Sequence, residues 1–150
     1  MRGAVVVAGL AALALSACNG QTATGSNGKI CADFKTKAAP PAGLSADAAA
    51  VDECTRRWAY SLASSRDDAG TVAEAAAAAC QTHLARWNQV ALNQPTGGEA
   101  SASLITGEPT TPMAEHNNFA HARALFYVVQ ARAGNCAPPP AKDGVPEGVS

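Results

Sequence analysis

The sequence predicts an all-α fold: a small three-helix bundle in which an antiparallel helical hairpin is braced by disulfides, with a flexible N-terminal tether and a disordered C-terminal tail. Three observations predict it. Apolar residues recur at three- and four-residue steps in three segments, a short link joins the first two segments, and the chain has five cysteines. Because aromatic residues make up only 5% of the chain and alanine dominates the apolar fraction, we expect a thin core that needs disulfides.

The first helix is expected to run from Ser45, a favourable N-cap, to about Ser64, with Asp47 near the positive end of the helix dipole. Its apolar stripe consists of four residues at helical spacing: Val51, Cys54, Trp58 and Leu62. Three residues lie off this stripe, so we expect them to project toward solvent or a partner: Arg56, Arg57 and Tyr60.

The second helix is expected to begin near Thr71, where Thr71-Val72-Ala73-Glu74 fits a capping box, and to continue to about Leu92. Its stripe is formed by Ala76, Cys80, Leu84, Trp87 and Ala91.

The third helix is expected to open with Pro112 in its first turn and to end before Gly134. Its inward face should carry Phe119, Ala122, Phe126 and Val129. Arg123 and Arg132 should project outward from it.

Spacing favours one of the three possible disulfide pairings. The link at residues 66–70 is short, so the first two helices should form an antiparallel hairpin. Cys54 lies 13 residues before Asp67 and Cys80 lies 13 after it, so both sit roughly 20 Å from the turn. We therefore expect a Cys54–Cys80 bridge, which leaves Cys31 to pair with Cys136. Loop-closure entropy gives these bridges about 3.5 and about 5 kcal/mol of stabilisation.

The N-terminal residues have the layout of a signal peptide. Arg2 precedes an apolar stretch from Ala4 to Leu15, which ends in Leu15-Ser16-Ala17-Cys18. The stretch has about a dozen residues, whereas a helix needs roughly 20 to cross the hydrocarbon core, so we expect removal rather than a permanent span. An ordinary secretory signal cut near Ala17 is the alternative.

The motif Leu15-Ser16-Ala17-Cys18 resembles the lipobox of bacterial lipoproteins. The resemblance implies cleavage before Cys18 and lipid on that cysteine. Two or three acyl chains would make attachment to the cell envelope effectively permanent. Asn19, in place of the aspartate that in Gram-negative lipoproteins favours the inner membrane, implies the outer membrane, facing the periplasm.

Composition divides the chain into four parts: a signal peptide at 1–17, a lipidated cysteine and flexible tether at 18–29, a helical disulfide-braced domain at 30–136, and a disordered proline-rich tail at 137–150. Residues 93–111 form an unusually long connection. They either pack Leu104 and Ile105 on the bundle as a crossover or form a partner-binding loop, whose candidate residues are Glu99, Leu104, Ile105 and Glu108.

Signatures of several chemistries are missing from the sequence. The net charge is −1 and no basic run follows the signal peptide, so we expect no nucleic-acid partner. There is no nucleophile elbow, phosphate loop, Cys-x-x-Cys pair or zinc-protease motif, so we expect neither an enzyme nor a cofactor.

Metal binding is not expected either. On a helix His116 and His121 point about 140° apart. A composite site of His83 with His121 stays open, but surface or capping roles are favoured for all three histidines.

The segment from Glu53 to Tyr60, followed by an alanine-rich helix with its own cysteine, resembles small uncharacterised exported proteins with a helical cysteine hairpin. The sequence therefore predicts a membrane-anchored envelope lipoprotein that acts as a non-catalytic interaction or structural module, with an envelope protein as its expected partner. Alternatives are an inhibitor or immunity-type protein that binds a periplasmic enzyme, and a small ligand carrier.

Overall fold

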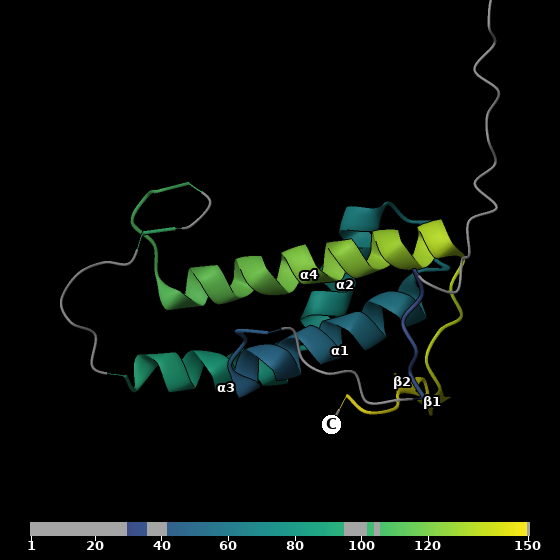
Figure 1. Ribbon diagram of the computed structural model, residues 1–150, viewed down its shortest axis with the longest axis horizontal. Helices are drawn as coiled ribbons and strands as arrows, with labels where there is room; N and C mark the ends of the chain where they lie inside the picture. Colours follow the sequence, from purple (N-terminus) through teal and green to yellow (C-terminus); the bar gives the residue numbers. More distant parts are fainter. Residues whose placement is uncertain (1–29, 36–41, 95–101, 104–105, 150) are drawn as a thin grey trace, which may run out of the picture.

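A computed structural model describes residues 30–35, 42–94, 102–103 and 106–149. It has four helices and two short strands: α1 (Ala46–Leu62), α2 (Ala69–Ala79), α3 (Gln81–Leu92), α4 (Pro112–Gly134), β1 (Ala141–Lys142) and β2 (Val145–Pro146). The predominantly helical fold is confirmed (Figure 1). The predicted signal peptide and tether, together with Cys18, lie outside the described residues. No helix in the described part is long and apolar enough to cross a bilayer.

α1 begins where the sequence predicts it. The Ser45 hydroxyl accepts a hydrogen bond from the backbone N–H of Ala48 at 3.2 Å, and Asp47 lies in the first turn. This cap satisfies one of the N–H groups that have no partner within the helix. α1 ends at Leu62, close to the predicted Ser64.

The second predicted helix is two helices rather than one. It begins at Ala69 after the N-cap Asp68, whose side chain accepts from the backbone N–H of Thr71, and it breaks at Cys80. There the backbone has φ −101° and ψ 14°, and the Cys80 N–H donates to Ala77 O at 3.0 Å. Neither glycine nor proline marks this position, so no local signal could have predicted the break.

The two disulfides join the pairs that the spacing favours. Cys54 of α1 is bonded to Cys80, at the junction of α2 and α3. Cys31 is bonded to Cys136, so the segment before α1 is fastened to the end of α4. Each bridge therefore links parts of the chain that no continuous helix connects.

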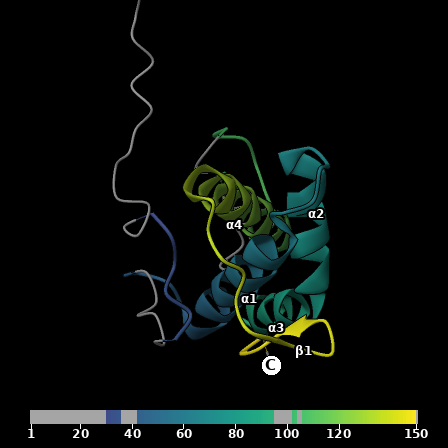
Figure 2. The same cartoon turned by 90° about the vertical axis from the view of Figure 1, so that its right-hand side faces the viewer.

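The core is built mainly from alanine. Its buried members come from all four helices and include Val51, Ala59, Tyr60, Val72, Ala73, Ala76, Leu84, Ala124, Val128 and Ala131. α4 packs on both α1 and α2, and Figure 2 shows the helices around this shared centre. Small side chains let the helix backbones approach closely, so the core is compact but presents little apolar area per residue.

The predicted inward face of α4 is right for Phe119, which packs against the core, and wrong for the exposed Ala122, Phe126 and Val129. Phe126 and Val129 are each 52% exposed, whereas the buried residues of this helix are Ala120, Ala124, Tyr127, Val128 and Ala131. α4 is thus rotated so that its alanines and Tyr127 face the other helices. In this orientation Tyr127 makes the polar contact described below.

Three residues of α1 predicted to project outward are buried instead. Arg56 is 8% exposed, Arg57 9% and Tyr60 2%. The sequence pattern of α1 alone failed here because these side chains are covered by segments far away in the chain, residues 30–35 and the C-terminal segment.

The C-terminal segment, expected to be disordered, is ordered. β1 and β2 form an antiparallel pair in which Ala141 lies opposite Pro146. Asp143 and Gly144, with φ 51° and 80°, make the two-residue turn between them. Arg57 Nη1 donates to Glu147 O at 2.6 Å and His83 Nε2 donates to Val149 O at 2.7 Å, which ties the segment to α1 and α3 (Figure 2). The Asp-Gly turn signal outweighs the disorder suggested by the prolines.

Candidate functional site

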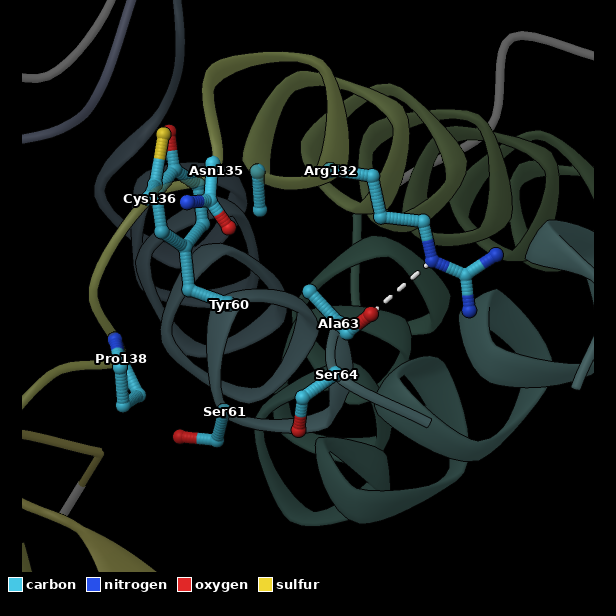
Figure 3. Close-up of a pocket in the computed structure, with 9 residues that line it drawn as sticks. Tyr60, Ser61, Ala63, Ser64, Arg132, Asn135, Cys136 and Pro138 are labelled. Carbon is cyan, nitrogen blue, oxygen red and sulfur yellow. Dashed lines mark hydrogen bonds between the residues drawn. The ribbon is translucent and has the colours of Figure 1, made fainter. Parts of the chain in front are cut away.

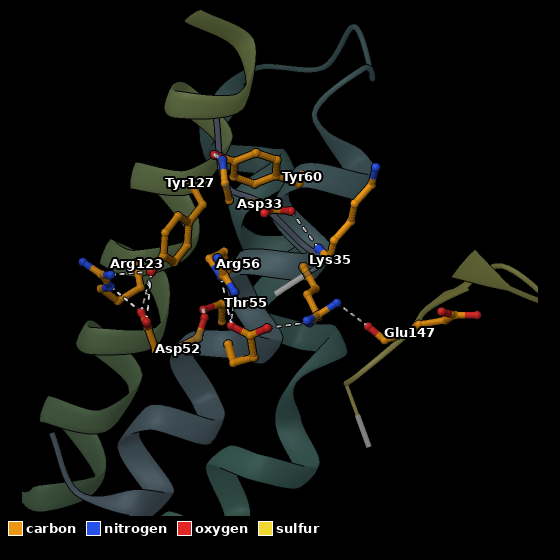
Figure 4. Close-up of polar contacts among 12 residues, drawn as sticks. Asp33, Lys35, Asp52, Thr55, Arg56, Tyr60, Arg123, Tyr127 and Glu147 are labelled. Carbon is orange, nitrogen blue, oxygen red and sulfur yellow. Dashed lines mark hydrogen bonds and ion pairs between the residues drawn. The ribbon is translucent and has the colours of Figure 1, made fainter. Parts of the chain in front are cut away.

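A buried polar cluster joins α1 to α4. Asp52 is 5% exposed, and the Tyr127 hydroxyl lies 2.9 Å from each of its carboxylate oxygens. Arg123 Nε donates to Asp52 Oδ1 at 2.5 Å, and Arg123 Nη2 donates to the Tyr127 hydroxyl (Figure 4). Asp52 therefore receives hydrogen bonds from two side chains of α4, which compensates for its burial.

The electrostatics of this cluster favour a protonated tyrosine. Burial raises the pKa of Tyr127, and the negative charge of Asp52 raises it further. Burial lowers the pKa of Arg123, but its hydrogen bond to Asp52 and the negative charge of that carboxylate contribute in the opposite direction, and the pKa is raised overall. Tyr127 thus holds its proton as a hydrogen-bond donor, so the cluster is suited to cross-linking helices rather than to proton transfer.

A second polar cluster holds residues 30–35 and the C-terminal segment against α1. Glu53 accepts from Arg56 Nε at 2.9 Å and from Arg57 Nε at 2.6 Å. The guanidinium carbons of the two arginines lie 5.0 and 5.3 Å from the centre of the Phe34 ring. Because Arg57 also donates to Glu147 O, one group of side chains holds residues 30–35, α1 and the C-terminal segment together (Figure 4).

Tyr60 extends this cluster toward α4. Its hydroxyl donates to Gln130 Oε1 at 2.9 Å and accepts from the backbone N–H of Ala32 at 3.1 Å. Burial raises the pKa of Tyr60. The Phe34 ring meets it edge to face, with centroids 5.0 Å apart. Tyr60 thus connects α1, α4 and the segment before α1.

A small cavity lies between the C-terminal ends of α1 and α4 (Figure 3). Its volume is about 210 Å³, and it is lined by Tyr60, Ser61, Ala63, Ser64, Ala131, Arg132, Asn135, Cys136 and Pro138. Ser61 Oγ is buried without a hydrogen-bond partner in the described part of the chain. Arg132 is directed to backbone carbonyls, with Nε 3.0 Å from Ala63 O. The cavity is smaller than typical ligand pockets of about 300–1,000 Å³.

The chemistry of this cavity is limited. Its lining holds two serine hydroxyls, but no histidine or carboxylate that could activate one of them. Arg132 is occupied by the carbonyl oxygens of Ala63, Ser65 and Asp67. The cavity can hold a small polar molecule, and its residues supply no arrangement for covalent or acid–base catalysis.

The three histidines lie in three different environments. His83 holds Val149, His121 is exposed, and His116 stacks on Trp87 with ring centroids 3.6 Å apart. His116 Nδ1 donates to Asn88 Oδ1 at 2.7 Å, and burial lowers the pKa of His116. Within the described residues, no group of three or more His, Cys, Asp or Glu side chains is placed to hold a metal ion.

Only Glu108 of the predicted partner-binding residues is described; Glu99, Leu104 and Ile105 lie outside the described residues. Glu108 is exposed; its carbonyl oxygen accepts a hydrogen bond from Ser103 N, and Ser103 O accepts one from Gly107 N, each at 2.9 Å. An isolated bridge pairs Ala102 with Pro109. These contacts leave Glu108 at the surface.

The residues that sequence reasoning missed are Asp52 and Tyr127. Asp52 follows Val51, a core residue of α1, and Tyr127 follows Phe126, which was expected to face inward. The available signal was that Asp52 and Arg123, two residues of opposite charge, lie on two different predicted helices. The sequence does not show that these two helices pack together with the two residues side by side.

No protein-family model matches the chain, and no curated protein or solved structure matches it. Its function is therefore inferred from its own residues.

Removing the Asp52 carboxylate should destabilise the fold strongly. Asp52→Ala is expected to lower the free energy of unfolding by about 3 kcal/mol, because it leaves two donors without their shared acceptor. Tyr127→Phe should cost about 1–2 kcal/mol. Urea unfolding followed by circular dichroism measures both. Arg86→Ala is the matched control, because it breaks an ion pair with Asp47 whose arginine side chain is 78% exposed, and should cost under about 0.5 kcal/mol. Equal losses for Asp52→Ala and Arg86→Ala would contradict the role of the cluster.

Stability should fall on mild acidification through His116. Its pKa is lowered in the folded state, so the unfolded chain binds the proton more readily. The stabilisation is therefore complete above the unfolded pKa of about 6.5 and is lost as the pH falls below it. Thermal melts at pH 7.5 and pH 5 should show a smaller drop in midpoint for His116→Phe, which keeps the stacking on Trp87, than for the native protein. His121→Phe, at an exposed site on the same helix, should retain the native drop; a native-sized drop in His116→Phe would refute the assignment.

Proposed function

We propose that this protein is a membrane-anchored cell-envelope lipoprotein. It is cut before Cys18 and held by lipid on that residue, at the outer membrane and facing the periplasm. Its helical domain is a non-catalytic interaction or structural module, displayed on the tether formed by residues 18–29.

The use of the cysteines carries this proposal. The chain has five, and four of them are paired in two disulfides. Disulfides of this kind belong to oxidising compartments outside the cytoplasm. The one cysteine left over is Cys18, which ends the lipobox-like Leu15-Ser16-Ala17-Cys18. A single unpaired thiol at the position where acylation requires one is the simplest reason for an odd number of cysteines in an exported chain.

The internal use of the polar groups supports a module that binds rather than catalyses. Asp52 is engaged in a contact between helices, Arg57 in a contact with the C-terminal segment, and Glu53 in an ion pair with Arg57 within α1. The cavity near Ser61 lacks a titratable group able to act as a base. Charged groups committed to holding the fold together are not available for proton transfer, so binding through the surface is the activity that these residues suit best.

We also propose that the module is in effect a three-helix bundle. α2 and α3 both pack on α1 and on α4, and Cys80 between them is fixed to α1 by its disulfide. α2 and α3 together thus take the place of the second helix of the predicted hairpin.

Acylation of Cys18 is the first test. Intact-mass analysis of protein extracted from bacterial membranes should show an N-terminal cysteine with two or three acyl chains, because the thiol and the new amino group are the acylated atoms. Cys18→Ser should remove the added mass and either release the protein from the membrane or stall its processing, because cleavage before this residue follows acylation of its thiol. Ser16→Thr, which retains the thiol, is a control for effects of altering the segment. A mature N-terminus without lipid would refute the lipoprotein proposal.

A second test addresses the interaction module. In-cell crosslinking of the lipidated protein should yield one specific envelope partner, and replacing residues 96–110 by a short Gly-Ser linker should abolish that crosslink, because this segment is the longest connection between helices and contact energy is spread over a patch. Glu74→Ala, at an exposed position of α2, should leave the crosslink unchanged. If a single histidine or glutamate substitution abolished activity in a folded protein, a catalytic or metal-dependent function would replace this proposal.

A further inference from the structure

α4 leaves an apolar stripe outside the bundle. Leu125 is 42% exposed, Phe126 52% and Val129 52%. These side chains lie with the exposed Ala122 and Ala133 at three- and four-residue steps, so they share one side of the C-terminal half of the helix. We call these five residues the outer α4 face. It points away from the core residues Ala124, Val128 and Ala131 of the same helix.

The size of the face limits what can cover it. Three large side chains that are about half exposed offer on the order of 300 Å² of apolar surface, whereas a stable protein–protein interface buries roughly 800 Å² per partner. The face is therefore too small to hold a second copy of the chain by itself. It suits a surface to which the domain is already tethered, because tethering replaces the entropy that free association would lose.

The described chain begins beside this helix. Ile30, itself 43% exposed, lies at the C-terminal end of α4, where its Cγ2 would be 3.4 Å from a Cβ placed on Gly134 (Figure 1). The bridge between Cys31 and Cys136 fixes this position. Residues 18–29 can span at most about 40 Å when fully extended. A lipid on Cys18 thus keeps the outer α4 face within about one domain diameter of the bilayer.

The charges of the helix favour the same surface. Residues 118–133 contain no carboxylate, and the one arginine there that is paired with an acidic side chain is Arg123, whose partner is Asp52 of α1. The hydrogen-bond partners of Arg132 are backbone carbonyl oxygens, which carry no net charge. A short apolar stripe on a helix segment without carboxylates suits the headgroup region of an anionic bilayer, because no negative side chain of that segment repels the lipid phosphates.

We propose that the outer α4 face docks on the lipid surface to which Cys18 is anchored. This inference rests on the proposed lipidation. Leu125, Phe126 and Val129 enter the boundary between headgroups and acyl chains. The domain then has a fixed orientation, in which α1, α3 and the C-terminal segment, which lie together on one side of α4 in Figure 2, are available to a partner.

Quenching by brominated lipid tests the docking. The lipidated full-length protein, processed in bacteria, is reconstituted in vesicles of phosphatidylethanolamine and phosphatidylglycerol with brominated acyl chains. The additional fluorescence of Phe126→Trp should fall by about half or more, because bromine quenches tryptophan at the depth where interfacial side chains lie. Val90→Trp is the matched control, since Val90 is 42% exposed on α3, and its additional fluorescence should be unchanged.

A second arm separates this inference from the lipidation itself. The Cys18→Ser form is mixed with the same vesicles, and the bound fraction is measured by sedimentation; Phe126→Ser should weaken that binding about tenfold, whereas Val90→Ser should not. If Cys18 carries no lipid, this arm still reports docking, and binding that depends on Phe126 supports it. Unquenched fluorescence of Phe126→Trp in the lipidated protein overturns the inference while leaving the lipoprotein proposal intact. A crosslinked dimer that Phe126→Ser abolishes also overturns it, because a second copy then covers the face.

Discussion

The hydroxyl of Tyr127 and the carboxylate of Asp52 meet in the interior of the bundle, and their contact sets the rotation of α4 about its axis. Turning Phe126 and Val129 inward would gain about 1–2 kcal/mol for each half-exposed side chain. It would also carry Tyr127 and Arg123 away from Asp52, and an unpaired buried carboxylate costs several kcal/mol. The cost of leaving the Asp52 carboxylate unpaired exceeds the gain from burying Phe126 and Val129. Alanines and Tyr127 therefore face inward, and the larger apolar residues stay outside. The outer α4 face is a consequence of this choice.

An alanine-rich core with few large side chains has to be stabilised at its edges. The two disulfides and the Glu53–Arg56–Arg57–Phe34 cluster do this, because they hold the segments before α1 and after α4 against the helices. Arg57 is central, since its guanidinium contacts Glu53, Phe34 and the backbone of Glu147. The terminal segments therefore form part of the folded domain, and the C-terminal hairpin completes the surface that covers α1 and α3.

The proposed anchoring and the proposed docking use different parts of the chain for one purpose. An acylated Cys18 would confine the domain near a membrane, and the outer α4 face would then orient it. Each alone would be weak in specificity: a flexible tether sets distance without direction, and about three half-exposed apolar side chains bind lipid only weakly. Combined, they would present one side of the domain outward, which is what an interaction module at a membrane surface requires.

Local patterns in the sequence determined the helical class, the capped start of α1, the start of α4 at Pro112 and the preferred cysteine pairs, because helical periodicity, caps and equal distances from a turn act over short stretches of chain. The tertiary structure alone decided the break at Cys80, the burial of Arg56, Arg57 and Tyr60, and which face of α4 turns inward. The Asp143-Gly144 turn was readable in the sequence, but the proline-rich composition around it suggested disorder. Burial depends on which distant segments cover a side chain, and the hydrogen-bond donors of the buried Asp52 carboxylate come from another helix. Periodicity within one helix therefore could not reveal the burial of these side chains or the partners of Asp52.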